Sequence, residues 1–275
     1  MILYKYLPLD DKNDKGFDSL KIFTDKTLWY SSPLDFNDPF DCKPIMKVPS
    51  LKDMKRENGD LFKQVAVNLG VKGVKKLDSD RRSYIGLKNN VESGKFLRDL
   101  TGKVGVTCFS ETPKEILMWS HYANNHKGFV VEFEVIPSRY EECLKSISEK
   151  ELFDCMIYNL LAQPVKYTQE RPVLKPYIKG MKEGELVERL LHSKSSIWQY
   201  EREHRIVASL MHPPGPYRFN PSLLKRVVVG MCMPDDYLQK LKKAVQFFEQ
   251  KNQVQVQVLY ANESSEHYAV EITGL

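Results

Sequence analysis

The segment VGVTCFSETPKEILMWSHYANNHKGFVVEFEV, residues 104–135, indicates the fold class more clearly than any other stretch of the chain. Its composition predicts a strand over 104–109, a short helix around 113–123 and a second strand over 128–135. The connection between the strands holds a dense set of polar and aromatic side chains: Ser110, Trp119, Ser120, His121, Tyr122 and His126. Because binding and chemical groups often sit on connections between rigid strands, we expect this segment to form part of a site.

Simpler roles also explain some of these residues. Thr112 or Ser110 can cap the helix, and Glu115 stands three residues after Thr112, as in a capping box. Trp119 and Tyr122 are as well suited to a core as to a ligand. The histidines at 121 and 126 are five apart, which is a poor spacing for two metal ligands on one helix face, so a zinc site is not expected.

The rest of the chain interleaves strands and helices without a regular βαβ rhythm. Strands are expected over 2–7, 27–31, 223–229, 254–259 and 267–272, and in the second half of 198–210. A polar turn over 10–23 leads into a short helix, and further helices are expected over 50–100, 137–161, 175–194 and 234–250. This pattern predicts one α+β domain, residues 1–275, with a mixed, mainly antiparallel sheet and helical insertions at about 50–100 and 140–195.

The bulk composition narrows the class of protein. The net charge of +5 permits nucleic-acid binding, but charge alone does not argue for it without a concentrated basic patch. No apolar run approaches the roughly 20 residues that span a bilayer, and no secretory signal is recognisable, so we expect a cytoplasmic protein without a membrane partner. The five cysteines are scattered without a CxxC pair, which predicts reduced, mostly buried thiols rather than disulfides or a cysteine zinc site.

The stretch WQYEREHRIV, residues 198–207, carries the second candidate group of side chains. In a strand, Glu201, Glu203 and Arg205 would point to one face. One interpretation is a solvated strand with cross-strand ion pairs. The other is a carboxylate held by Arg205 in a cleft, where it could bond a ribose hydroxyl or act as a general base.

The stretch FNDPFDC, residues 36–42, with Asp35 beside it, has two readings as well. Asn and Asp side chains before proline are typical of a rigid turn. The same carboxylates could instead hold a metal such as Mg²⁺. Glycine-rich phosphate motifs and the GxSxG motif are absent from the sequence, so P-loop, classical dinucleotide-fold and α/β-hydrolase classes receive no support.

Several motifs occur together in an order that resembles a bacterial family catalogued only as domain of unknown function 2971. They are LYKYLP, LWYSSP, DFNDPFDC, CFSE, ILMWSHYANNHKGF, VEF, WQYEREHRI and VVVGMCMPDD, and they extend over nearly the whole chain. The family description implies no activity. Some members are associated with phage defence or abortive infection, which implies an effector role.

The layout also resembles, more remotely, that of ADP-ribosyltransferases. That resemblance implies an early-strand residue at Lys5 or Tyr6, a serine at Ser110 with Tyr122 after it, and a late-strand glutamate at Glu201 or Glu203. The early residue and the serine would hold the nicotinamide ribose and amide of NAD, and the glutamate would bond the ribose 2′-hydroxyl. The chain departs from the usual motifs, because Lys5 and Tyr6 replace a His or Arg and Glu-Thr follows Ser110.

The resemblance therefore implies an NAD-consuming enzyme. Glu203 or Glu201 would be catalytic, and the cleft for NAD would be lined by Tyr4, Lys5, Tyr6, Ser110, Trp119, His121 and Tyr122. The resemblance does not specify the acceptor, which can be a protein, a nucleic acid, a small molecule or water.

Two alternative functions remain open at this stage. One is a metal-dependent nuclease or phosphoesterase using Asp38, Asp41, Glu201, Glu203 and a histidine. The other is a non-catalytic module that binds a ligand or nucleic acid.

Overall fold

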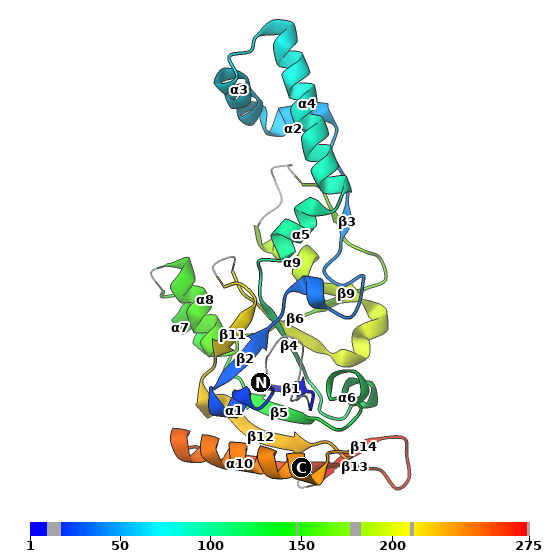
Figure 1. Cartoon of the computed structure of the whole chain (residues 1–275), viewed down its shortest axis with the longest axis vertical. Helices are drawn as coiled ribbons and strands as arrows, with labels where there is room; N and C mark the ends of the chain where they lie inside the picture. Colours follow the sequence, from blue (N-terminus) through cyan, green and yellow to red (C-terminus); the bar gives the residue numbers. More distant parts are fainter. Residues whose placement is uncertain (10–17, 147, 177–182, 210–211, 274–275) are drawn as a thin grey trace. The chain divides into compact units, whose positions relative to one another are not determined.

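The computed structural model describes residues 1–9, 18–146, 148–176, 183–209 and 212–273 (Figure 1). Its contacts divide the chain into two compact units. Unit 1 comprises Met1–Ser32, Val104–Val165 and Ile197–Leu275, and unit 2 comprises Pro33–Lys103 and Lys166–Ser196. In the part of the chain that is described, no helix is long and apolar enough to cross a membrane.

Unit 1 is built on an eight-stranded sheet with the order β14-β13-β12-β5-β1-β4-β10-β6. Its strands are β1 (Ile2–Leu7), β4 (Val106–Ser110), β5 (Phe129–Glu134), β6 (Gln163–Pro164), β10 (Glu203–Val207), β12 (Leu224–Val229), β13 (Gln257–Glu263) and β14 (Val270–Thr273). The β12–β13 pair is parallel and the other neighbours are antiparallel. A separate pair joins β2 (Thr27–Tyr30) to β11 (Gly215–Arg218). The predicted α+β class with a mixed, mainly antiparallel sheet is confirmed.

The helices of unit 1 pack on both faces of this sheet. They are α1 (Lys21–Thr24), α6 (Ile116–Tyr122), α7 (Arg139–Cys143), α8 (Glu149–Tyr158) and α10 (Asp235–Asn252), with 3₁₀ turns η2 (Ser196–Glu201) and η3 (Pro221–Leu223). Alternate residues of a strand point to opposite faces, so each strand supplies two apolar sets.

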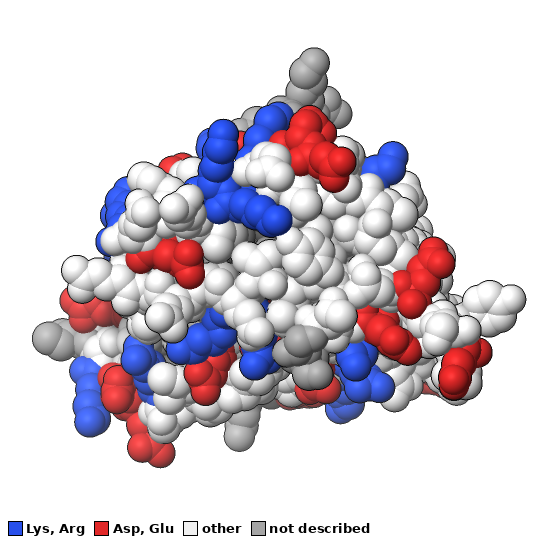
Figure 2. Space-filling model, turned by 90° about the horizontal axis from the view of Figure 1, so that it is seen from below, with Lys and Arg blue, Asp and Glu red and all other residues white. Residues whose placement is uncertain are grey.

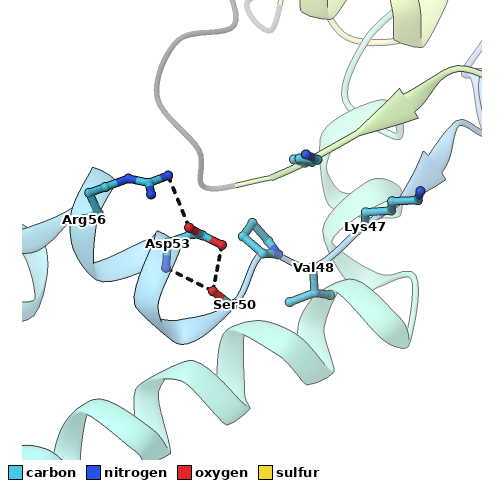
Figure 3. A pocket seen from close by; sticks show the side chains of 7 residues that line it. Lys47, Val48, Ser50, Asp53 and Arg56 are labelled. Atoms are coloured by element: carbon cyan, nitrogen blue, oxygen red, sulfur yellow. Dashed lines mark hydrogen bonds and ion pairs between the residues drawn. The ribbon is translucent and has the colours of Figure 1, made fainter.

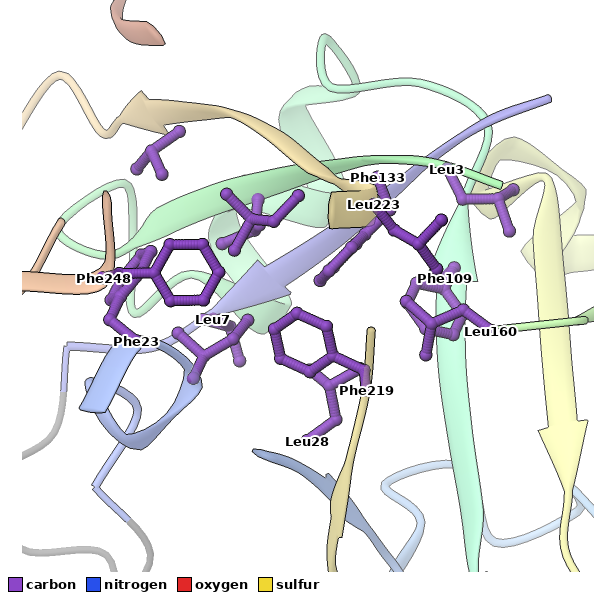
Figure 4. Close-up of a cluster of buried hydrophobic side chains, with 14 of the residues drawn as sticks. Leu3, Leu7, Phe23, Leu28, Phe109, Phe133, Leu160, Phe219, Leu223 and Phe248 are labelled. Atoms are coloured by element: carbon purple, nitrogen blue, oxygen red, sulfur yellow. The ribbon is translucent and has the colours of Figure 1, made fainter. Parts of the chain in front are cut away.

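The larger set forms a core with α1 and α10 that includes Leu3, Leu7, Phe133 and Phe248 (Figure 4). The smaller set forms a second core with α6, including Tyr6, Trp119, Val130 and Val228. The two cores therefore lie on opposite faces of the sheet.

Unit 2 is mainly helical over the predicted insertion at 50–100. It contains η1 (Pro33–Asp35), α2 (Leu51–Glu57), α3 (Gly59–Asn68), α4 (Gly73–Glu92), α5 (Lys95–Thr101) and α9 (Glu183–Leu191). Two short parallel pairs complete it, β3 (Ile45–Met46) with β8 (Val173–Leu174) and β7 (Lys166–Thr168) with β9 (Ser193–Ser195). Inside this unit Lys55 Nζ lies 2.5 Å from the carboxylate of the buried Asp80, which ties α2 to α4.

Some element boundaries differ from those that the sequence predicts. The strand expected at 254–259 begins only at Gln257, because Gln253 adopts φ 54° at the end of α10 and the chain turns there. In the stretch 198–210, the strand is restricted to 203–207. Residues 196–201 form the 3₁₀ turn η2, and Arg202 follows with φ 44°. The polar turn at 10–17 and residues 177–182 of the helix expected at 175–194 lie outside the described residues.

The expectation of reduced thiols is wrong for two of the cysteines. Cys143 at the end of α7 and Cys155 in α8 form a disulfide, with their Cα atoms 5.5 Å apart. They are separated by 12 positions, and the packing of the two short helices that carry them brings them together. This approach is a tertiary one that no CxxC-like spacing signals. Cys42, Cys108 and Cys232 are free thiols.

Candidate functional site

A row of polar side chains crosses six neighbouring strands of the unit 1 sheet. Each member is the direct partner of the next, in the order Glu203, Ser110, Tyr4, Glu132, Arg226 and Gln257. Directly paired residues share a face of the sheet. For this row it is the face covered by α6, because the next residues inward on three of the strands are Val130, Val228 and Leu259 of the second core. We call these six residues the polar row.

The polar row is buried over most of its length, which sets it apart from an ordinary solvated sheet edge. Ser110 is 0% exposed, Glu132 3%, Glu203 4% and Tyr4 9%. Arg226 opens to solvent, with 36% of its side chain exposed. Burying polar groups costs free energy unless they are hydrogen-bonded, so the row requires specific partners along its length.

Glu201 meets the buried end of the row. Its Oε1 accepts a hydrogen bond of 2.8 Å from the hydroxyl of Tyr122 on α6, and its backbone carbonyl accepts one of 2.7 Å from Ser110 Oγ. The positive φ of Arg202 turns the chain between η2 and β10, so Glu201 is positioned by this bend rather than by strand alternation. The expectation that Glu201, Glu203 and Arg205 share a face as one strand is therefore wrong for Glu201.

Glu203 is held by a cation from its own strand. Arg205 Nε donates to Glu203 Oε1 at 2.6 Å and Nη2 donates to Oε2 at 3.0 Å, and both side chains are buried. Such a two-point contact fixes the carboxylate and compensates its charge. Beside them, burial first and the Glu203 carboxylate second raise the pKa of the Cys108 thiol well above its usual value. The thiol of Cys108 is therefore held in its protonated, weakly nucleophilic form.

The middle and open end of the row form a second set of contacts. Burial and the adjacent Glu132 carboxylate raise the pKa of Tyr4 to about 12, so its phenol stays protonated and can donate to Glu132. Arg226 Nη1 lies 3.3 Å from Glu132 Oε2, and Arg226 Nε donates to Gln257 Oε1 at 3.2 Å. The buried carboxylate of Glu132 is thus shared between a phenol and a guanidinium.

The other two candidate residues on β1, Tyr6 and Lys5, lie on opposite faces of the sheet. Tyr6 lies on the α6 face, where its hydroxyl donates to the Thr112 carbonyl at 2.9 Å and burial raises its pKa. Lys5 lies on the opposite face. Its Nζ donates to Thr107 Oγ1 at 3.0 Å and to the Cys108 carbonyl at 2.9 Å. Lys5 is therefore not brought together with Tyr4, Ser110 and Glu201.

The candidate residues on α6 differ in burial and in the groups that they contact. Trp119 is fully buried, and its indole Nε1 donates to the Pro113 carbonyl at 2.7 Å. His126 stacks on it, with ring centroids 6.1 Å apart. His121 is exposed on the surface of α6, and its ring centroid lies 6.0 Å from that of Trp198 on η2. Of the α6 candidates, Tyr122 is the one that reaches the polar row, through Glu201.

Sequence reasoning missed three members of the row: Glu132, Arg226 and Gln257. One signal was available, because Glu132 interrupts the apolar run FVVEF of β5. A lone carboxylate on the inward face of a core strand requires a partner. Its partner could not be named, since the pairing of β5 with β12 depends on the topology of the whole sheet.

The aspartates of FNDPFDC lie in unit 2 and have partners of their own. Asp38 Oδ1 accepts a bond of 2.8 Å from the backbone N–H of Phe40, as expected for a rigid turn. Asp41 lies 3.7 Å from the ammonium of Lys194, and both side chains are buried. Within the described residues, no group of three or more His, Cys, Asp or Glu side chains could hold a metal ion.

Unit 2 also contains a surface pocket lined by Lys47, Val48, Pro49, Ser50, Asp53, Arg56 and Lys175 (Figure 3). Its one carboxylate is already engaged. Ser50 Oγ donates to Asp53 Oδ2 at 2.7 Å, and Arg56 lies 3.2 Å from Asp53 Oδ1. The pocket is basic, and its carboxylate is paired within the pocket, so we take the buried polar row as the candidate site.

The positive net charge is not gathered on the face of the molecule seen in Figure 2. There Lys and Arg side chains alternate with Asp and Glu side chains around an uncharged centre. A continuous basic surface of the kind that follows a nucleic-acid backbone is absent from this face.

Comparison with known proteins gives one match, which covers part of the chain. Residues 118–206 match the family model described as "Protein of unknown function (DUF2971)". No curated protein and no solved structure matches the chain. The matched span runs from α6 to β10, and so contains both Tyr122 and Glu201. The family resemblance seen in the sequence is confirmed for residues 118–206, the segment that matches this family model.

Proposed function

We propose that this protein is an NAD-consuming enzyme of the ADP-ribosyltransferase-like kind, with its active site at the Glu201 end of the polar row. The observation that carries the proposal is that two hydroxyls meet Glu201: Tyr122 donates to its carboxylate at 2.8 Å, and Ser110 donates to its backbone carbonyl at 2.7 Å. A serine, an aromatic ring and a glutamate are the side-chain types that the resemblance to ADP-ribosyltransferases implies around the nicotinamide and its ribose.

The carboxylate of Glu201 is the better candidate for the catalytic group. The hydroxyl of Tyr122 donates to its Oε1 at 2.8 Å and orients the carboxylate. Glu203 is different, because Arg205 binds both of its oxygens. Glu201 is therefore assigned to the ribose and its developing positive charge, and the Glu203–Arg205 pair is assigned to positioning β10.

In the proposed reaction, the bond between the ribose C1′ and the nicotinamide nitrogen breaks, and its electron pair leaves with neutral nicotinamide. A nucleophilic oxygen or nitrogen of the acceptor then bonds to C1′ and loses its proton. The cationic sugar between these events is stabilised by a fixed negative charge in a site with little water, where such an interaction is strong. Glu201 is 2% exposed, so its carboxylate lies away from bulk water.

The proposal does not specify the acceptor of the ADP-ribose group. A protein, a nucleic acid, a small molecule or water can each supply the attacking atom. A cytoplasmic effector in phage defence or abortive infection is the setting that the family resemblance suggests. We do not propose the metal-dependent nuclease, since Asp38 and Asp41 are engaged by Phe40 and Lys194 within unit 2.

The test is proton NMR of NAD incubated with the full chain. We expect wild type to release nicotinamide and Glu201→Gln to release it at least about a hundredfold more slowly, as on losing a preorganised charge. Glu263→Gln, an exposed carboxylate on β13, is the matched control and should keep the wild-type rate.

Three results would count against the proposal. No nicotinamide release, either alone or with added candidate acceptors, would remove the NAD chemistry. NAD line broadening without turnover would favour a binding module. Full activity of Glu201→Gln would assign the chemistry to another residue.

A further inference from the structure

We propose that the surface pocket of unit 2 binds a small phosphate monoester, whose phosphate group is held by Lys47, Lys175 and Arg56. This inference is independent of the NAD chemistry, because the residues that line the pocket belong to unit 2 and none of them belongs to the polar row. It follows from the volume of the pocket, the charges on its wall and the contacts that these charges make.

The pocket is large enough for an organic ligand. Its volume is about 390 Å³, and pockets above roughly 300 Å³ are of the size that small molecules occupy. Val48 and Pro49 add apolar surface to the same wall as the charged side chains (Figure 3). We therefore expect a ligand that combines an anionic group with an organic part.

Two lysines of the pocket stand side by side on neighbouring strands. The register of β3 with β8 places Met46 opposite Leu174, and Lys47 and Lys175 are the next residues of the two chains. The backbone N–H of Lys47 donates to the Leu174 carbonyl at 2.8 Å, so the pairing extends to the lysines. Like charges in such a position repel each other, and a bound anion would remove the repulsion.

The two ammonium groups have no carboxylate partner among the residues that the structure describes. Neither Lys47 nor Lys175 takes part there in a side-chain hydrogen bond or ion pair, and both side chains are exposed. Other lysines of the same unit do pair, as Lys63 does with Asp60 at 3.5 Å. Both ammonium groups can therefore turn to a ligand without breaking a contact within the described chain.

Arg56 presents one free edge of its guanidinium. Its Nη2 lies 3.2 Å from Asp53 Oδ1 and its Nε lies 3.1 Å from Glu57 Oε1, so carboxylates hold the edge formed by these two nitrogens. Within the described residues, Nη1 makes no such contact. An arginine oriented in this way can donate to phosphate oxygens from its other edge, while lysines act on phosphate as point charges.

The pocket is positive although it contains Asp53. The hydrogen bond from Ser50 and, to a smaller extent, the charges of Arg56 and Lys175 lower the pKa of Asp53, so its carboxylate is ionised at neutral pH. Three cations and one carboxylate leave an excess of two positive charges on the wall. A phosphate monoester has a charge of about −1.5 to −2 at pH 7, which matches this excess.

The experiment is a phosphorus NMR titration of ribose 5-phosphate with the full chain, with ribose and inorganic phosphate as competitors. The test variant is Lys47→Gln combined with Lys175→Gln, which removes two exposed charges and keeps the side chains long. Lys75→Gln combined with Lys76→Gln is the matched control, because it removes two adjacent charges from α4 of the same unit, outside the pocket. Thermal unfolding of each variant establishes that it is folded.

We expect wild type and the control to bind ribose 5-phosphate equally well and the test variant to bind it at least about tenfold more weakly, because two charge-assisted contacts are lost. Ribose should not displace it, and inorganic phosphate should displace it only at a higher concentration.

The proposal is overturned if wild type does not bind ribose 5-phosphate, or if the test variant binds it as wild type does. Equal weakening in the test variant and the control would show a general effect of charge and would also refute it. Displacement by inorganic phosphate at an equal or lower concentration would refute the monoester, since the organic part would then contribute nothing.

Discussion

The hydroxyl of Tyr122 donates to the carboxylate of Glu201 at 2.8 Å, although the two residues are 79 positions apart in the chain. One lies at the end of α6 and the other at the end of η2, so the contact joins the two connections that flank the sheet. It fixes the direction of a buried carboxylate. For this reason it is the contact whose removal should affect chemistry more than stability.

Tyr122→Phe should lower the rate of nicotinamide release by about tenfold, because the carboxylate of Glu201 loses the hydrogen bond that orients it. This corresponds to an increase of roughly 1.4 kcal/mol in the activation free energy. The fold should persist, since the ring that packs against the second core is kept. Single-turnover kinetics with NAD would measure this, with Tyr140→Phe on the exposed face of α7 as control. An unchanged rate would show that Tyr122 does not position the catalytic carboxylate.

Arg205→Met should destabilise the protein by about 3–5 kcal/mol, because it removes the guanidinium that contacts both oxygens of the buried Glu203 carboxylate. The double variant Arg205→Met with Glu203→Gln should recover much of that loss, since neither charge then remains. Urea unfolding of wild type, Arg205→Met, Glu203→Gln and the double variant, monitored by tryptophan fluorescence, gives the four values of this cycle. Equal loss in the single and double variants would mean that the pair stabilises the sheet through packing rather than through charge.

Gly128→Ala should be strongly destabilising, because a Cβ at this position would lie 2.1 Å from the backbone carbonyl oxygen of Leu7. A backbone oxygen of the central strand β1 cannot move aside as a flexible side chain could. Gly86→Ala, inside α4, is the contrasting variant. Its Cβ would meet nothing within 4 Å, and it should be neutral or stabilising by up to about 1 kcal/mol. Thermal unfolding of both variants tests the pair, and a stable Gly128→Ala protein would contradict this packing.

Asp154 should make a small, pH-dependent contribution to stability. Partial burial works to raise its pKa, but hydrogen bonds from Lys150 and His212 outweigh this and hold the pKa below its usual value. A lowered pKa in the folded state means stability that is present above the unfolded pKa, near 4, and is lost as pH falls through the folded value. The carboxylate is 48% exposed, so solvent screening limits the effect to about 1 kcal/mol.

The check on this prediction is the unfolding free energy of wild type and Asp154→Asn between pH 2 and pH 7. The difference between them should be greatest near neutral pH and should shrink below pH 4. A difference that stays constant across that range would assign the effect to shape or packing at α8 rather than to charge.

Much of the fold follows from local sequence. The apolar alternation of β1, β5 and β12 and the amphipathic pattern of α10 are local signals, and these elements lie within a few residues of their predicted positions. The candidate site follows only in part. Ser110, Tyr122 and Glu201 could be nominated by residue type, but Glu132 and Arg226 enter the site through the pairing of β5 with β12. Strand order and register depend on the whole sheet, and no local pattern encodes them.

The bend at Arg202 illustrates the same limit. Read as one strand, residues 201–205 place three charged side chains on one face, whereas the positive φ at Arg202 separates Glu201 from β10. An arginine in the left-handed region has no sequence signature, since Gly, Asn and Asp are the residues that favour it. The position of Glu201 could therefore be learned only from the three-dimensional structure.

The sequence positions of the polar row determine when it can assemble during synthesis and folding. Its members stand at positions 4, 110, 132, 203, 226 and 257, and β1 at the centre of the sheet pairs with β4 and β5, which follow it by about a hundred residues. Contacts of such high sequence separation form late and slowly. A chain still on the ribosome therefore holds the early members of the polar row without the assembled row, which is complete only after synthesis has passed β13.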